Sequence, residues 1–232
     1  MFNSFEFDAP LSFEFDAPRF FGFLLGFVIG TTFHEFMHAY SALRLGDTTA
    51  QREGRVTLNP ASHFDPLGFG LGVLLALGIG FIAWGRPVPV NPYALRFGRR
   101  GMSIVAVAGP ISNLVFAAVL APLYKFSEGR ISSEASTVLY YMIAINLALF
   151  AFNLIPIPPL DGFNILSGIL PNAWVPIMQP IYRYSIPILL TCVFFLPVIG
   201  NQLQIPLNPI QQALLPVISL LQHVLLGGGG LF

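Results

Sequence analysis

Two histidines and a glutamate stand close together in an otherwise apolar stretch, in the order His34-Glu35-Phe-Met-His38. Residues four apart on an α-helix lie on one face, so both imidazole rings can bind one metal ion. This H-E-x-x-H spacing is typical of zinc sites in which the glutamate acts on a water molecule beside the metal. The predicted chemistry is hydrolysis, with His34 and His38 as Zn²⁺ ligands and Glu35 as the catalytic base.

A catalytic zinc ion needs a third protein ligand and an open position for water. Asp161 is the strongest candidate. A predicted helix ends near Asn153 and the carboxylate follows at the same membrane face as the histidine pair, where it would be costly without a partner. The alternative for Asp161 is a turn residue in the sequence Pro-Leu-Asp-Gly. Three further candidates are His63, Asp65 and His223, whose positions better suit capping, solvated or interfacial roles.

The elements that hold these residues are expected to lie in a membrane. Of 232 residues, 55% are hydrophobic and 9% are charged, whereas a soluble domain carries about 25% charged residues. We expect a single all-α, polytopic membrane domain over residues 19–226, after an acidic and aromatic segment (1–18) and before a flexible tail (227–232). About five transmembrane helices are predicted, at residues 20–43, 101–124, 137–155, 184–200 and 209–226.

Two segments are less regular. Residues 66–84 are apolar but contain five glycines, so we expect a re-entrant segment or a sixth crossing of the membrane. Residues 52–58 alternate in polarity before Asn59-Pro60, which predicts a short β-strand or hairpin element.

The basic residues favour re-entry of residues 66–84, because short cytoplasmic loops carry an excess of Lys and Arg. With re-entry, eight of the 11 basic side chains share the cytoplasmic side, and the N-terminus lies outside. A sixth crossing removes most of this asymmetry. The eight are Arg44, Arg52, Arg55, Arg86, Arg96, Arg99, Arg100 and Arg183, and the three outer ones are Arg19, Lys125 and Arg130.

The motif at His34, together with Asn153-x-x-Pro-x-x-Pro-Leu-Asp161-Gly162, resembles the site-2 protease family of intramembrane zinc metalloproteases. Gly109-Pro-Ile-Ser-Asn113 is similar to a third motif of that family. The segments 54–60 and 86–92 resemble a compact bacterial branch that has no PDZ-like or CBS-like domain.

The resemblance implies a Zn²⁺ ion held by His34, His38 and Asp161, with Glu35 as the catalytic carboxylate. It further implies that the chain cuts transmembrane or membrane-proximal segments of other proteins, in regulated intramembrane proteolysis. The expected location is the lipid bilayer of a bacterial cytoplasmic membrane.

Asn113 has two interpretations. The resemblance implies a catalytic role, in which its amide stabilises the substrate or the reaction intermediate. The residue alone equally suits a buried amide that bridges helices, and Asn146 and Asn153 share this ambiguity.

Two other classes of protein stay open at this point. Intramembrane histidine and carboxylate groups also mark the ion path of a divalent-metal transporter, and a catalytically inactive scaffold could bind membrane helices. Nucleic acid is not an expected partner, because the net charge is zero and no dense basic cluster is present. The oligomeric state is not predicted.

Overall fold

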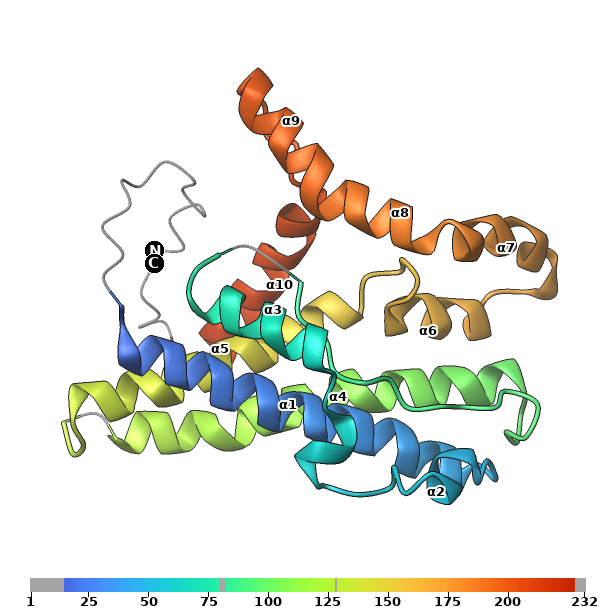
Figure 1. The fold of residues 1–232 in the computed structure, drawn as a ribbon, viewed down its shortest axis with the longest axis horizontal. Coiled ribbons are helices and arrows are strands. Elements are labelled where there is room, and N and C mark those ends of the chain that lie inside the picture. The colour runs from blue at the N-terminus through green and yellow to red at the C-terminus, as the bar shows by residue number, and fades with distance from the viewer. Residues whose placement is uncertain (1–14, 80–81, 128, 228–232) are drawn as a thin grey trace.

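The computed structural model describes residues 15–79, 82–127 and 129–227, and this part of the chain is helical, without a β-strand. Figure 1 shows the arrangement of the helices. The expected all-α, polytopic membrane architecture is confirmed by five helices that are long and apolar enough to cross a membrane. These are Ala17–Arg44 (α1), Arg99–Ser127 (α4), Ser133–Asn153 (α5), the continuous Ser185–Leu203 (α8 to α9) and Pro209–Leu226 (α10).

Helices α1, α4 and α5 lie side by side and form the body of the molecule (Figure 1). A stripe of small residues on α1 allows the close approach of α5, since Gly22, Gly26 and Gly30 recur every fourth residue and are buried. A Cβ atom at Gly22 would lie 2.6 Å from the carbonyl oxygen of Val138 on α5. The same helical face continues to His34, so the close packing of α1 on α5 leads directly to the metal motif.

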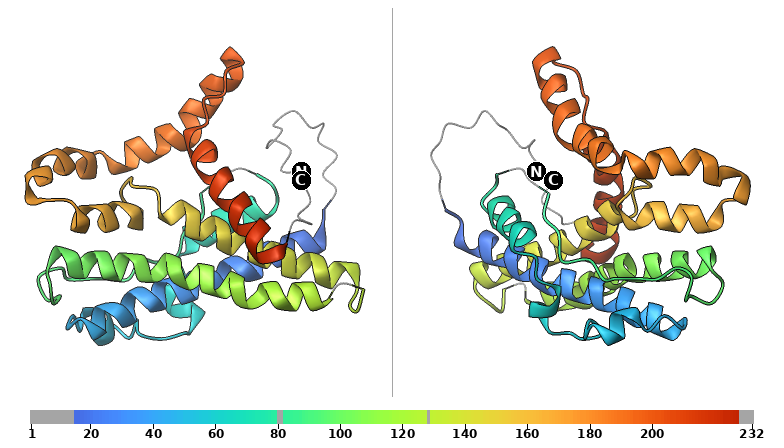
Figure 2. Two further views of the ribbon diagram at one scale, coloured as in Figure 1. Left: turned by 180° about the vertical axis from the view of Figure 1, so that it is seen from behind. Right: turned by 45° about the vertical axis from the view of Figure 1, so that its right-hand side comes forward.

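Helix α10 packs against α4 and α5 and closes an apolar core. Fully or nearly fully buried side chains from the three helices meet there, among them Ala117, Ile143, Leu147 and Ile218. The helices α7 (Val175–Arg183), α8 (Ser185–Leu190) and α9 (Leu196–Leu203) extend away from this body (Figure 2). A π-helical segment, Thr191–Phe195, joins α8 to α9.

The glycine-rich segment enters the fold and turns back. Its helix α3 (Pro66–Ala76) has 11 residues and is about 16 Å long, too short for a hydrocarbon core of about 30 Å. A Cβ atom at Gly68 would lie 2.8 Å from Cδ1 of Trp84, so the chain returns to the point where α3 begins. A short helix whose chain returns to its start is the geometry expected of a re-entrant segment, which stays a prediction.

The predicted β-strand at residues 52–58 is wrong. The chain there leaves the short helix α2 (Thr49–Arg52), turns at Gly54 with φ of +67°, and continues without ladder hydrogen bonds into the 3₁₀ helix Pro60–His63. The physical reason lies in the segment that passes beside it, residues 86–92, in which three prolines have no N–H group. The N–H groups of Val88 and Asn91 are donated to side chains instead of to a β-ladder. Side chains make the connections instead.

Two short helices after α5 were not predicted. Helix α6 (Asp161–Ile169) follows a proline-rich turn, and α7 is preceded by the 3₁₀ helix Asn172–Trp174. The proposed boundaries of the membrane domain at residues 19 and 226 stay predictions, although α1 begins two residues earlier, at Ala17. Most of the N-terminal segment and of the C-terminal tail lies outside the described residues.

Candidate metal centre

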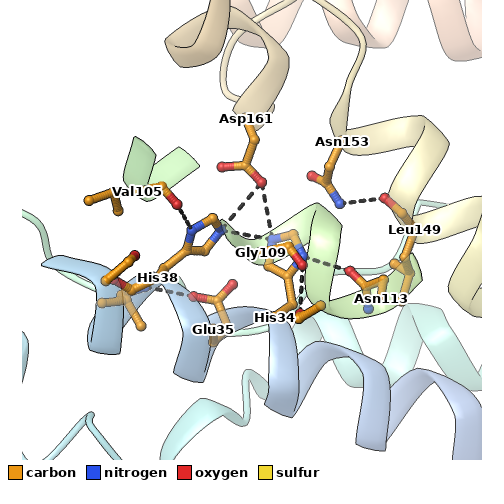
Figure 3. Close-up of polar contacts among 12 residues, drawn as sticks. His34, Glu35, His38, Val105, Gly109, Asn113, Leu149, Asn153 and Asp161 are labelled. Carbon is orange, nitrogen blue, oxygen red and sulfur yellow. Dashed lines mark hydrogen bonds and ion pairs between the residues drawn. The ribbon is translucent and has the colours of Figure 1, made fainter. Parts of the chain in front are cut away.

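Three side chains converge between α1 and the start of α6 (Figure 3). The Nε2 atoms of His34 and His38 are 2.9 Å apart. The Oδ2 atom of Asp161 lies 3.1 Å from Nε2 of His34 and 3.3 Å from Nε2 of His38. Both histidines are 8% exposed, so the three atoms form a small triangle that is largely shielded from solvent.

The hydrogen-bond partner of Nδ1 determines which nitrogen of each histidine ring carries the hydrogen. Nδ1 of His38 lies 2.8 Å from the carbonyl oxygen of Val105, and Nδ1 of His34 lies 2.8 Å from Oδ1 of Asn113. Both oxygens only accept hydrogen bonds, so each Nδ1 carries the hydrogen and each neutral ring keeps a lone pair on Nε2. Two imidazole lone pairs and the Asp161 carboxylate therefore point at one another.

This arrangement fits a divalent metal ion. A tetrahedral zinc with bonds of about 2.0–2.1 Å keeps its ligand atoms about 3.3 Å apart, close to the edges of the observed triangle. Three converging acceptors repel one another unless a cation lies between them, and hydrogen bonds from Nδ1 are the usual support of zinc-binding histidines. Two histidines and one carboxylate also leave a fourth position for water, as in catalytic zinc sites.

Two glycines make room for the ligands. A Cβ atom at Gly109 of α4 would lie 2.8 Å from Cε1 of His34 and would also collide with the ring of His38. A Cβ atom at Gly162 would collide with the carbonyl oxygens of the two residues that follow α5, Leu154 and Ile155. The Pro-Leu-Asp-Gly sequence can therefore fold back onto α5 and start α6 at Asp161, which carries its carboxylate to the histidines.

The Glu35 side chain lies beside the histidines (Figure 3). Its Oε2 atom accepts a hydrogen bond of 2.9 Å from the backbone N–H of Val88. Val88 belongs to an extended stretch, residues 86–92, which we call the strap. The strap crosses α1 at the metal motif and holds one oxygen of the carboxylate.

A buried arginine anchors the strap. Nη2 of Arg55 donates a 2.6 Å hydrogen bond to the carbonyl oxygen of Arg86, and the N–H of Arg86 donates to the carbonyl oxygen of His63 at 2.8 Å. Arg55 is 4% exposed. Burial lowers the pKa of its guanidinium, and the negative charge of Glu35 acts in the opposite direction. A cation thus lies within the electrostatic reach of Glu35.

The other candidate ligands have different partners. His63 is buried and contacts the carbonyl oxygen of Thr57 at 2.8 Å, and Asp65 caps α3 through the N–H of Gly68 at 2.7 Å. His223 is exposed on α10. Among the described residues, the one group with metal-ligand geometry is His34, His38 and Asp161.

Val88 and Arg55 were not predicted as site residues, and Asn146 was predicted only with an ambiguous role. The segments that contain Val88 and Arg55 both resemble the family. That resemblance marked the two segments as important but did not indicate what either residue does. Asn113 does lie at the centre, where its amide contacts His34; its predicted role in stabilising the intermediate stays a prediction.

The sequence matches the family model of peptidase family M50 over residues 128–196. A Bacillus subtilis protein named "Putative zinc metalloprotease YwhC" is 38% identical over 151 residues, which are 62% of this chain and 67% of that protein. The protein of Mycobacterium tuberculosis named "Putative zinc metalloprotease Rip2" is 30% identical over 180 residues, 77% of this chain and 68% of that protein. Its namesake in Mycolicibacterium smegmatis is 33% identical over 147 residues, 62% and 55% respectively. No solved structure matches the chain.

A polytopic helical membrane fold with zinc metalloprotease relatives defines the class of intramembrane zinc metalloproteases. The chain belongs to peptidase family M50, the site-2 proteases. This membership favours the protease over the metal transporter and the inactive scaffold, and zinc is the metal of the family.

Proposed function

We propose that His34, His38 and Asp161 bind the catalytic zinc ion and that the chain uses it to cut peptide bonds in or beside transmembrane segments of other proteins. The observation that carries this proposal is the convergence of two imidazole lone pairs and a carboxylate within 3.3 Å of one another. A buried cluster of acceptors without a cation is unfavourable, and the open fourth position suits a hydrolytic water.

Glu35 is the general base of the proposed reaction. A zinc ion held by His34, His38 and Asp161 would lower the pKa of a bound water to about 7 and would polarise the scissile carbonyl. Glu35 takes the proton from the attacking water and delivers it to the leaving amine. The N–H of Val88 holds Oε2 of Glu35, which orients the carboxylate and leaves Oε1 for the proton transfer.

A substrate helix must unwind locally before hydrolysis, because its carbonyl groups are engaged in its own hydrogen bonds. We expect faster cleavage of transmembrane segments that contain Gly, Pro or Asn near the cut, since these residues weaken a helix. The unwound stretch has to pass close to the strap, because the strap contacts Glu35.

We place the chain in a bacterial cytoplasmic membrane with its N-terminus outside. The supporting observation is the charge asymmetry with a re-entrant α3. His34 lies about 15 Å along α1 from Arg44, the predicted cytoplasmic end of the helix. The site would be submerged and closer to the cytoplasm than to the outer face.

The direct test of the metal site is zinc content and peptide cleavage of the purified full chain. Wild type should hold about one zinc per chain and cut a panel of transmembrane peptides. His34→Ala and Asp161→Ala should lose both properties, while His223→Ala, a histidine on the exposed face of α10, should lose neither. Zinc retention by both site variants would contradict the proposed ligands.

A further inference from the structure

Two asparagine side chains are fully buried in the body of the molecule, Asn113 on α4 and Asn146 on α5, each 0% exposed. The amide of Asn113 is fully engaged. Its Oδ1 atom lies 2.8 Å from Nδ1 of His34, and its Nδ2 group donates to the carbonyl oxygen of Gly30 and to Oδ1 of Asn146, both at 3.0 Å. Both amide hydrogens therefore already have acceptors.

The amide of Asn146 continues the chain of hydrogen bonds to the backbone. Its Nδ2 group donates to the carbonyl oxygen of Gly26 at 3.1 Å and to that of Met142 at 2.8 Å. Carbonyl oxygens cannot donate. Asn146 must therefore face them with its NH₂ group and turn its oxygen toward Asn113.

The direction of every hydrogen bond in this series follows from the backbone carbonyl oxygens that Asn146 contacts. With the oxygen of Asn146 toward it, Asn113 must present its NH₂ group there and its own oxygen to His34. The Nδ1 atom of His34 must then carry the hydrogen. Because a neutral imidazole has one N–H group, Nε2 is left with the lone pair that faces Asp161.

The two amides pack closely against the backbone of α1. A Cβ atom at Gly30 would collide with the amide oxygen of Asn146 and would lie 3.2 Å from Nδ2 of Asn113. The glycine stripe of α1 thus has a second use, because it opens the space that the two amides fill between α1, α4 and α5.

We propose that Asn146 is a positioning residue of the zinc centre, which acts through Asn113 to hold His34 as the tautomer whose Nε2 binds the metal. The proposal rests on the proposed zinc site. It gives Asn113 the task of orienting a ligand, and it extends the site by a residue on α5 that touches none of the three ligands. Partners that orient a metal-binding histidine typically change metal affinity by about 10- to 100-fold.

The test is a double-mutant cycle on the purified full chain, read out as the zinc dissociation constant in competition with a chelator. The variants are Asn146→Ala, Asn113→Ala and the pair together, with Asn146→Leu as a second removal of the same amide. Gln222→Leu, which removes a buried amide of α10 outside the centre, is the matched control. Thermal unfolding of each metal-free variant reports the loss of packing separately.

We expect Asn146→Ala to weaken zinc binding by about 10- to 100-fold, and to have no further effect once Asn113 is alanine, because it acts through that residue. Gln222→Leu should bind zinc like wild type. Unchanged affinity in both Asn146 variants would overturn the proposal, and so would an equal loss in the presence and absence of Asn113. If wild type itself binds no zinc at the centre, the proposed function fails instead.

Discussion

The backbone N–H of Val88 donates a 2.9 Å hydrogen bond to Oε2 of Glu35. The two residues come from different elements, the strap and α1, and the bond ties the position of the proposed base to a short extended segment. Val88 lies between two prolines, so its N–H is the one that this part of the strap can offer to Glu35.

Val88→Pro should therefore impair catalysis without removing the metal. The substitution deletes the N–H, and a hydrogen bond to a charged group contributes about 1.5–3 kcal/mol, which corresponds to a fall in kcat of roughly 10- to 100-fold. Val88→Ala keeps the N–H and should retain most of the activity. Equal cleavage rates of the two variants at equal zinc content would show that the bond does not orient Glu35.

Arg55→Met should also lower kcat, by about tenfold. The guanidinium holds the carbonyl oxygen of Arg86, two residues before Val88, so its loss frees the strap. Arg55→Lys should recover part of the rate, because an ammonium group can still donate to one carbonyl. Arg52→Met removes an exposed charge from the same region and should behave like wild type. Cleavage kinetics and zinc content of the three variants check this, and full activity of Arg55→Met would refute it.

Gly109→Ala should weaken zinc binding by at least about tenfold, since overpacking a filled space costs about 1–3 kcal/mol. The added methyl group would collide with the ring of His38 and crowd that of His34, which displaces two ligand atoms. Gly70→Ala on α3 meets no atom within 4 Å and serves as the control. Chelator competition measures both. Identical zinc affinity of the two variants would mean that the rings of His34 and His38 can move more freely than the packing indicates.

Asp47 makes the fold sensitive to acid. Burial acts to raise its pKa, but hydrogen bonds from the hydroxyl of Thr49 and the N–H groups of Asn91 and Thr49 outweigh it, so the pKa lies below the ordinary value of 3.8. A lowered folded-state pKa stabilises the fold fully above that ordinary value, and the contribution disappears as the pH falls through the folded-state pKa.

Thermal unfolding between about pH 3 and about pH 7 tests this contribution, because the loss is expected at the acid end of that range. Wild type should lose stability below about pH 4. Asp47→Asn should be less stable than wild type at neutral pH, by about 2 kcal/mol, and its stability should fall less on acidification. Glu53→Gln, an exposed acidic position nearby, should keep the wild-type pH dependence. A parallel acid response of Asp47→Asn and wild type would exclude Asp47 as its source.

The long helices were predictable because each contains a predominantly apolar stretch of about membrane-spanning length. The convergence of the proposed ligands could be predicted, for His34 and His38 from helical spacing and for Asp161 from its costly position beside a membrane helix. Helices α6 and α7 were not predicted, because they are short and α7 contains two prolines. The strand at residues 52–58 was predicted from local alternation, but a strand needs a partner. Three prolines leave the neighbouring strap without a continuous series of N–H groups, so it cannot provide one.

The supporting residues depend on contacts between distant segments. Nothing in the local sequence around Val88 indicates that its N–H reaches Glu35, and nothing around Asn146 indicates that its amide continues a chain of hydrogen bonds to His34. The amide contacts exist because Gly30 of α1 leaves room for Asn113 and Asn146, and such packing is visible only in three dimensions.

Cleavage of a transmembrane-helix substrate by purified wild type beside Glu35→Gln, with zinc measured in both samples, tests the central claim most directly. Glutamine keeps the size of the side chain but cannot take up a proton at neutral pH. Wild type should cut the substrate, the variant should be at least about 100-fold slower, and both should hold about one zinc per chain. A Glu35→Gln variant that holds zinc and cuts at the wild-type rate would contradict the account.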